Sequence, residues 1–135
     1  MSGRAAVRIA SLPETALRPV RAHGGRGRIA FARLFARGDF AAPVNFVDYA
    51  VVPPGASIGR HRHGADEEIY LVLSGRGRMT LDAREFAVGP GSVIVNRPGG
   101  SHGLVNSGRT PLRLFVVEIA LAKPPRGARS RGSRK

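Results

Sequence analysis

Short apolar runs alternate with turn residues along the chain from residue 28 onward. The runs are rich in Val, Ile, Leu, Phe and Tyr, and clusters of Gly, Pro, Asn and Asp separate them. This arrangement is typical of β-strands joined by tight turns. It predicts strands at residues 28–36, 44–52, 58–63, 68–74, 77–82, 84–88, 92–96, 102–106 and 112–120.

Helical periodicity is weak throughout. The segment 11–20, SLPETALRPV, predicts one helical turn or so, because prolines lie on both sides of it. Many short strands with glycine-rich turns predict an all-β sandwich or barrel. Runs such as YLVL and LFVV are apolar at successive positions, so both faces of these strands must be covered. A barrel packed outside against a neighbouring segment or subunit would cover them.

The chain is short enough to predict a single domain. Its 135 residues leave no room for a second core of useful size. It has no cysteine, which excludes disulfides and thiolate metal ligands. Without a long apolar run or a secretory signal pattern, we expect a soluble cytoplasmic protein with no membrane partner. We divide it into a basic, partly flexible segment at 1–27, a β-barrel at 28–122 and a disordered basic tail at 123–135.

The formal net charge of +13 is concentrated at the two ends of the chain. Residues 1–29 carry +5 and residues 123–135 carry +6, whereas residues 30–122 carry only +2. The last segment, KPPRGARSRGSRK, is too poor in apolar residues to fold alone. No nucleic-acid-binding motif accompanies the charge, so we expect solubilising tails and no specific nucleic-acid partner.

Two histidines one residue apart introduce candidate chemistry. Side chains alternate faces along a strand, so His61 and His63 point the same way, with their Cα atoms about 6.6 Å apart. HGAD then turns the chain, and EEIYLVLSG runs back, which allows a carboxylate of the adjacent strand to face the same ion. Imidazole and carboxylate ligands suit Fe, Mn, Zn, Ni or Cu better than Ca or Mg. Taken alone, the pair is more typical of a polar strand face than of a metal site.

Residues 55–75 form a longer pattern around these histidines. They read G-x5-H-x-H-x4-E-x6-G, with Gly55, His61, His63, Glu68 and Gly75 in place. This resembles the first motif of the cupin superfamily at every position.

A second motif follows after 15 residues. Residues 91–106, GSVIVNRPGGSHGLVN, are similar to the second cupin motif, G-x5-P-x-G-x2-H-x3-N, at Gly91, Gly99, His102 and Asn106. Arg97 occupies the proline position and Pro98 follows it, which leaves the shape of this loop open. The two motifs in order imply a single-domain cupin, a jelly-roll β-barrel over about residues 30–122.

The resemblance implies that His61, His63, Glu68 and His102 are the ligands of one divalent transition metal. Glu67 competes with Glu68 for the carboxylate role, but motif spacing favours Glu68, and strand alternation lets only one of them face inward. Four ligands would leave positions of an octahedral ion open for a small-molecule substrate.

We expect an enzyme that acts on a small polar organic molecule. An Fe(II) dioxygenase is the first hypothesis, and a Mn- or Zn-dependent decarboxylase, isomerase or lyase is the next. The alternative is a noncatalytic module that binds or senses a small ligand through its metal.

Several further residues carry lesser hypotheses. Tyr70 shares the strand parity of Glu68, so it is a candidate hydrogen-bond donor or acid/base group, or a packed barrel tyrosine. Arg97 is a candidate cation for an anionic substrate, or a solvated loop arginine. Asp48, Tyr49 and Glu118 lie on predicted strands, but the face that each occupies is open.

Two other residues are expected to have structural roles. His23 reads as a loop histidine on a basic stretch, and Asn106 opens a turn in which its side chain would bond nearby backbone. A homodimer is also expected, because the apolar strand at 28–36 would otherwise be an exposed sheet edge.

Overall fold

A computed structural model describes residues 8–121. The strands are β1 (Arg18–Val20), β2 (Ile29–Ala36), β3 (Val44–Val52), β4 (Ser57–Arg62), β5 (Asp66–Ser74), β6 (Gly77–Leu81), β7 (Arg84–Val88), β8 (Val93–Asn96), β9 (Ser101–Val105) and β10 (Leu112–Ala120). Two short 3-10 helices, η1 (Leu12–Glu14) and η2 (Arg37–Asp39), complete the described elements. All nine predicted strands are present, with ends within two residues of those expected, and η1 is the single turn expected in 11–20.

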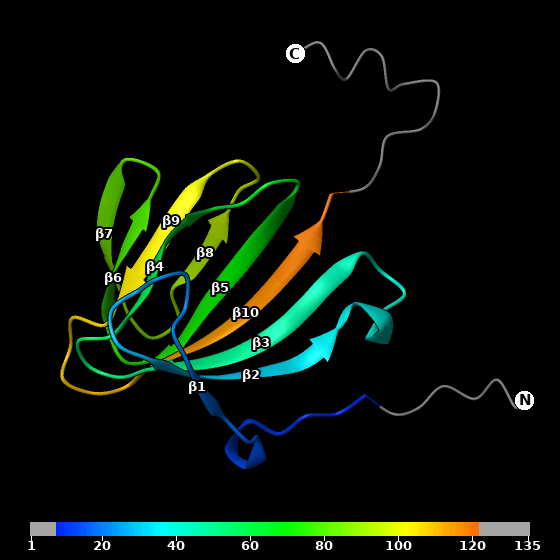
Figure 1. The fold of residues 1–135 in the computed structure, drawn as a ribbon, viewed down its shortest axis with the longest axis horizontal. Coiled ribbons are helices and arrows are strands. Elements are labelled where there is room, and N and C mark those ends of the chain that lie inside the picture. Colours follow the sequence, from blue (N-terminus) through cyan, green and yellow to red (C-terminus); the bar gives the residue numbers. More distant parts are fainter. Residues whose placement is uncertain (1–7, 122–135) are drawn as a thin grey trace, which may run out of the picture.

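The strands form two antiparallel sheets that face each other (Figure 1). The larger sheet has the order β1-β2-β3-β10-β5-β8, and the smaller has the order β4-β9-β6-β7. This confirms the expected all-β, barrel-like architecture, although hydrogen bonds between the described strands do not join the two sheets into one closed barrel.

Strand alternation sends even-numbered residues of β3, β5 and β10 into the barrel. The register sets Glu118 opposite Glu68 and sets Val116 opposite Tyr70 and Asp48. Tyr70, Val72, Leu112 and Leu114 belong to the buried core, which fills one end of the space between the sheets. Glu68 and Glu118 lie opposite each other in this register, and both charged side chains point inward next to this core.

The pairing of β4 differs from the sequence prediction. Strands β4 and β5 were expected to lie side by side, but β4 pairs with β9 in the smaller sheet and β5 pairs with β10 and β8 in the larger. The HGAD turn therefore carries the chain from one sheet to the other. A turn sequence shows that the chain changes direction, but it does not say which strand becomes the hydrogen-bonded partner.

Strand β1 and the loop behind it were not predicted as part of the barrel. β1 has three residues, including Pro19, so it gives almost no strand signal, and it pairs only with the first residues of β2. The segment 18–27, here called the strap, then crosses to β4 (Figure 1). There the amide of Gly59 donates to the carbonyl of Ala22, and the amide of Ser57 donates to that of Arg26. Much of the segment assigned to the N-terminal tail thus covers the barrel.

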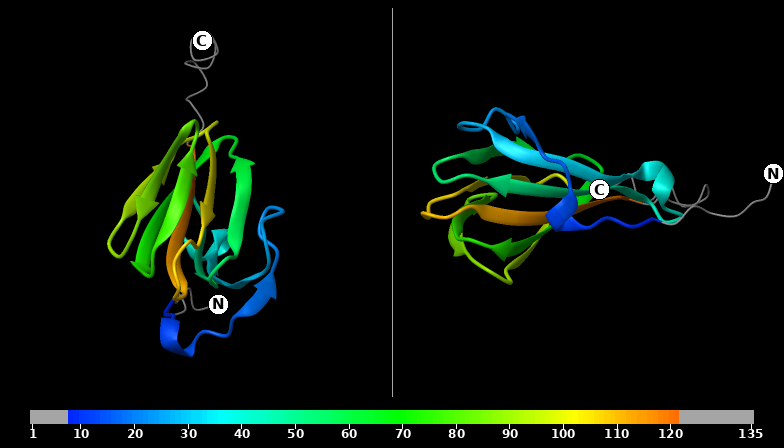
Figure 2. Two further views of the ribbon diagram at one scale, coloured as in Figure 1. Left: turned by 90° about the vertical axis from the view of Figure 1, so that its left-hand side faces the viewer. Right: turned by 90° about the horizontal axis from the view of Figure 1, so that it is seen from below.

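The outer side of β2 faces η1, which lies away from the smaller sheet (Figure 1, Figure 2). No helix in residues 8–121 is long and apolar enough to cross a membrane. The tail predicted to be disordered, residues 123–135, lies outside the described residues.

Candidate metal centre

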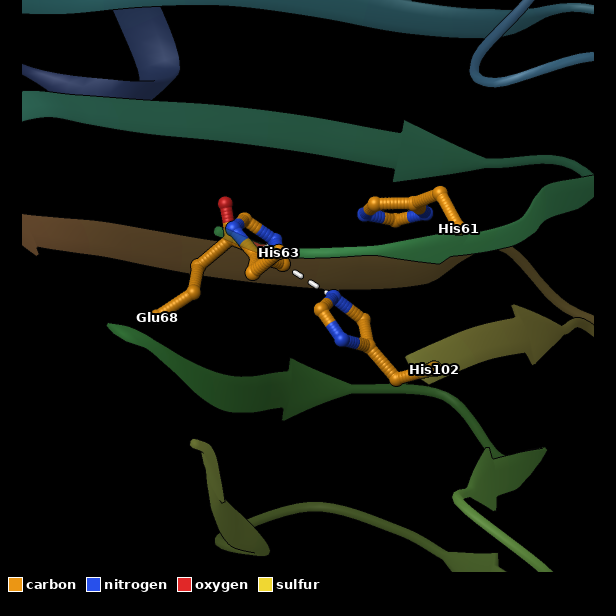
Figure 3. Close-up of side chains that lie close together, drawn as sticks. All are labelled: His61, His63, Glu68 and His102. Carbon is orange, nitrogen blue, oxygen red and sulfur yellow. Dashed lines mark hydrogen bonds and ion pairs between the residues drawn. The ribbon is translucent and has the colours of Figure 1, made fainter. Parts of the chain in front are cut away.

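Four side chains from the two cupin-like motifs point toward one point between the sheets (Figure 3). One ligand atom from each of His61, His63, Glu68 and His102 lies within 4.8 Å of the others. Oε1 of Glu68 is 3.0 Å from Nε2 of His63 and 3.1 Å from Nε2 of His102. His102 is fully buried and Glu68 is nearly so.

Both sheets contribute to this cluster. His61 on β4 lies directly opposite His102 on β9 in the smaller sheet. Glu68 comes from β5 of the larger sheet, and His63 lies in the crossing between them. Glu67 pairs with Ile119 on the opposite face of β5, so Glu68 is the carboxylate that joins the histidines.

Hydrogen bonds orient two of the imidazoles. Nδ1 of His61 is 2.8 Å from the carbonyl oxygen of Gly59, and Nδ1 of His63 is 2.6 Å from Oδ1 of Asp66. Each Nδ1–H donates to its oxygen, which leaves Nε2 as the nitrogen that faces the cluster. Metal-binding histidines commonly have such outer partners.

The electrostatic surroundings also suit a cation. Burial lowers the pKa of His61 to about 4, although its bond to Gly59 opposes this, so this imidazole is neutral near pH 7. Burial acts in the same direction on His63, but the Asp66 hydrogen bond and the charges of Glu68 and Glu118 outweigh it and raise its pKa. Surroundings that favour a proton on this group also favour a metal ion that replaces the proton.

The donor set fits a divalent transition ion. Three imidazoles and one carboxylate are typical ligands for Fe, Mn, Zn, Ni or Cu, whereas Ca and Mg prefer oxygen alone. The ring of His102 stacks on that of His63 with centroids 4.8 Å apart and lies edge-on to Tyr70 at 5.4 Å, so neighbouring rings contact it on two sides.

A cavity of about 410 Å³ opens beside the cluster. His63, Glu68 and Tyr70 line it together with residues of the strap and of the larger sheet. Tyr70 is only 2% exposed, and burial together with the charge of Glu68 raises its pKa well above the ordinary value. The phenol is therefore a permanent hydrogen-bond donor on the cavity wall.

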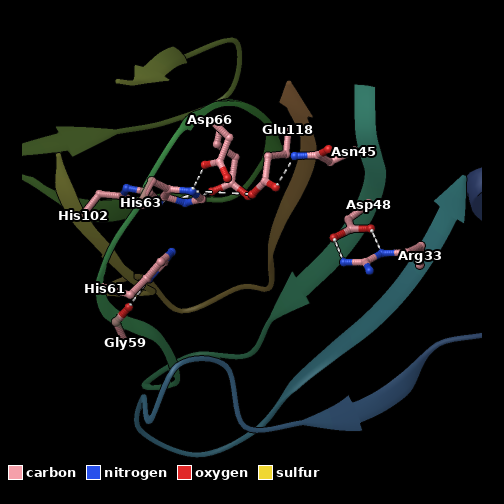
Figure 4. A network of polar contacts seen from close by, with 10 residues as sticks. Arg33, Asn45, Asp48, Gly59, His61, His63, Asp66, His102 and Glu118 are labelled. Carbon is pink, nitrogen blue, oxygen red and sulfur yellow. Dashed lines mark hydrogen bonds and ion pairs between the residues drawn. The ribbon is translucent and has the colours of Figure 1, made fainter. Parts of the chain in front are cut away.

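An ion pair crosses the part of the wall formed by β2 and β3 (Figure 4). Nε and Nη2 of Arg33 donate to the two carboxylate oxygens of Asp48, at 3.0 and 3.2 Å. The guanidinium also lies over the rings of Phe46 and Phe31, 4.1 and 5.8 Å from their centroids. Burial raises the pKa of Asp48 even though Arg33 opposes this shift.

Glu118 extends the polar network beyond His63 (Figure 4). Its Oε1 is 3.5 Å from Nδ1 of His63, and its Oε2 accepts from Nδ2 of Asn45 at 2.8 Å. Burial raises the pKa of Glu118, and the Asn45 hydrogen bond opposes it. The sequence left open which face of its strand each of Asp48 and Glu118 occupies, but in the structure both line the cavity.

Other candidates lie elsewhere. Tyr49 faces the outer side of the larger sheet, where its hydroxyl accepts from Arg113. Arg97 is exposed and does not line the cavity, whose arginines are Arg21 and Arg33. Asn106 is buried and its Nδ2 donates to the carbonyls of Val52 and Thr110, which is the structural role expected of it.

His23 is the residue that sequence reasoning missed. It lies in a turn, as expected, but its ring stacks on that of His61 with centroids 3.5 Å apart and an interplanar angle of 9°. It also lines the cavity. All four histidines of the chain thus gather at one site. Because the chain has only four histidines, their scarcity could have indicated that His23 belongs to the same site as the other three.

Comparison with known proteins agrees with this geometry. A family model described as a Cupin domain matches residues 48–118, which include all four clustered side chains. The chain belongs to the cupin family. An oxalate-binding protein from Thermotoga maritima is 31% identical over 98 residues, which are 73% of this chain and 81% of the relative.

Two solved structures are also similar to this cupin. A predicted oxalate decarboxylase from Thermotoga maritima superposes with a TM-score of 0.81 at 27% identity and covers 84% of this chain and 99% of that one. The polyketide cyclase RemF from Streptomyces resistomycificus has a TM-score of 0.70 at 25% identity, covering 89% of this chain and 83% of the other.

Proposed function

We propose that this cupin holds one divalent transition metal through His61, His63, Glu68 and His102 and binds a small carboxylate at the same centre. The observation that carries the proposal is the convergence of four ligand atoms, within 4.8 Å of one another, beside a cavity. A metal bound there would act as a Lewis acid toward a carboxylate or carbonyl oxygen.

The similar proteins support a carboxylate as the ligand. One is named an oxalate-binding protein, and another is described as a predicted oxalate decarboxylase. Among the reactions expected from the sequence, decarboxylation therefore moves ahead of Fe(II)-dependent dioxygenation. A decarboxylase and a noncatalytic binding protein would both use this centre, and analysis of the reaction products distinguishes them.

Decarboxylation requires a proton donor beside the ligand. The C–C bond breaks, CO2 leaves, and the remaining carbon takes up one proton. Glu118 lies directly opposite Glu68 in the larger sheet and Tyr70 follows Glu68 on the same face of β5, and both line the cavity. We propose that Glu118, whose pKa is raised by burial, supplies the proton and that the phenol of Tyr70 donates a hydrogen bond to the ligand.

Metal analysis tests the ligand set. We expect protein purified without added metal to contain about one ion per chain, and His61→Ala and His102→Ala to lose it. Arg62→Ala is the matched control, because Arg62 is exposed on the same strand and points away from His61. Equal metal content in wild type and both histidine variants would contradict the proposal.

Calorimetry and product analysis test the ligand. Oxalate should bind the metal-loaded protein and should not bind protein treated with chelator. Formate and CO2 after incubation with oxalate would identify a decarboxylase, and binding without product would identify a binding module. Absence of any carboxylate binding by the loaded protein would reject both forms of the proposed function.

A further inference from the structure

The cavity is larger than oxalate requires. Its volume of about 410 Å³ lies in the range of pockets that hold drug-sized molecules, about 300–1,000 Å³. Oxalate has two carboxylates and no apolar part, so it would occupy only the space beside the metal centre. The remaining volume is bounded by side chains that oxalate would not contact.

Those side chains are mainly apolar. Away from His63, Glu68 and Tyr70, and besides the polar residues Arg21, His23, Arg33, Asp48 and Glu118, the rest of the wall is apolar and is made by Val20, Ala22, Ile29, Phe31, Phe46, Ala50, Ile58 and Val116. Phe31 and Phe46 are only partly buried and pack against the edge of the core. Their apolar surface therefore faces the cavity, where an apolar ligand group would remove it from water.

Arg33 and Asp48, two of the charged groups on this side, are already engaged with each other. Both carboxylate oxygens of Asp48 accept hydrogen bonds from Arg33, whose guanidinium stacks on Phe46. Figure 4 shows this pair apart from the histidines, on the β2 and β3 side of the site. Because its charge is matched by Asp48, Arg33 does not offer a free cation for a second carboxylate of the ligand.

We infer that the physiological ligand is a carboxylate with an oxygen-donor head for the metal and an apolar, aromatic-sized body that packs against Phe31 and Phe46. This inference rests on the proposed function, because the carboxylate head requires the metal centre. It makes Phe31 and Phe46 specificity-determining residues, and it makes oxalate a fragment of the true ligand.

A matched pair of 2-oxo acids tests the inference. Pyruvate and phenylglyoxylate share the same chelating head, but phenylglyoxylate carries a phenyl group where pyruvate has a methyl group. With metal-loaded protein in a calorimeter, we expect phenylglyoxylate to bind about tenfold more tightly or better, because burial of an aromatic ring is worth that factor. Phe31→Ala should remove most of this advantage and leave pyruvate binding within about twofold of wild type.

Phe115→Ala is the control, because Phe115 is on β10 with the parity opposite to Val116 and faces the outer side of the same sheet. It should leave both affinities unchanged. Equal affinity of the two acids for wild type, or an equal loss of both in Phe31→Ala, would overturn the inference while the proposed function stands. If neither acid nor oxalate binds the loaded protein, the proposed function itself fails.

Discussion

Asp48 is a buried carboxylate, and the hydrogen bonds from Arg33 only partly offset the cost of burying its ionised form. Burial raises its pKa although Arg33 donates two hydrogen bonds to it. The folded protein therefore keeps a proton on Asp48 at pH values where the unfolded chain has lost it. The contribution of this group to stability is present in acid and is lost as the pH rises through the raised pKa.

Replacement of Asp48 should expose this pH dependence. Asp48→Asn keeps the shape of the side chain but cannot titrate, so we expect its stability relative to wild type to increase as the pH rises from about 4 to 7. Urea unfolding of metal-free protein at several pH values measures the difference. Glu85→Gln, which changes an exposed carboxylate on β7, is the control. A relative stability of Asp48→Asn that falls or stays flat over this range would contradict the prediction.

At the scale of elements, the strap is fixed to β4 by close backbone contact. Gly59 and Gly25 face each other across the contact, and a Cβ on Gly59 would overlap the carbonyl oxygen of His23. The strap brings Arg21 and His23 to the cavity, so the position of both depends on this contact.

Gly59→Ala should therefore detach the strap. We expect a loss of about 1–3 kcal/mol in the free energy of unfolding, as for other overpacked sites, and faster tryptic cleavage after Arg21, Arg26 and Arg28. Gly38→Ala is the control, because a Cβ at Gly38 meets no atom within 4 Å. Similar stability and cleavage of the two variants would show that the strap is not held by this contact.

For the whole molecule, the homodimer stays a prediction, but its basis has changed. The edge of β2 that suggested it is covered over its first residues by β1. Exposed apolar side chains lie instead on the outer face of β5 and β8, where Leu73, Val93 and Val95 are 37%, 64% and 48% exposed. Burial of these side chains against a second copy would remove them from water.

Light scattering tests the dimer directly. We expect the mass of two 14.3 kDa chains for wild type and of one chain for Val93→Lys. Val105→Lys, an exposed apolar position on the smaller sheet, should remain dimeric. A wild-type monomer at working concentration would refute the prediction.

Local sequence patterns determined much of this protein. Short apolar runs between turn residues predicted nine of the strands, strand alternation put His61 and His63 on one side, and motif spacing preferred Glu68 to Glu67. These features depend on neighbouring residues of one strand, so the sequence contains them in full.

Only the tertiary structure decided what lies opposite each strand. The pairing of β4 with β9 sets His61 beside His102, and the strap stacks His23 on His61. The Arg33–Asp48 pair depends on the register between β2 and β3. Such contacts join segments far apart in sequence, and their register follows from the packing of the whole barrel, which no local pattern records.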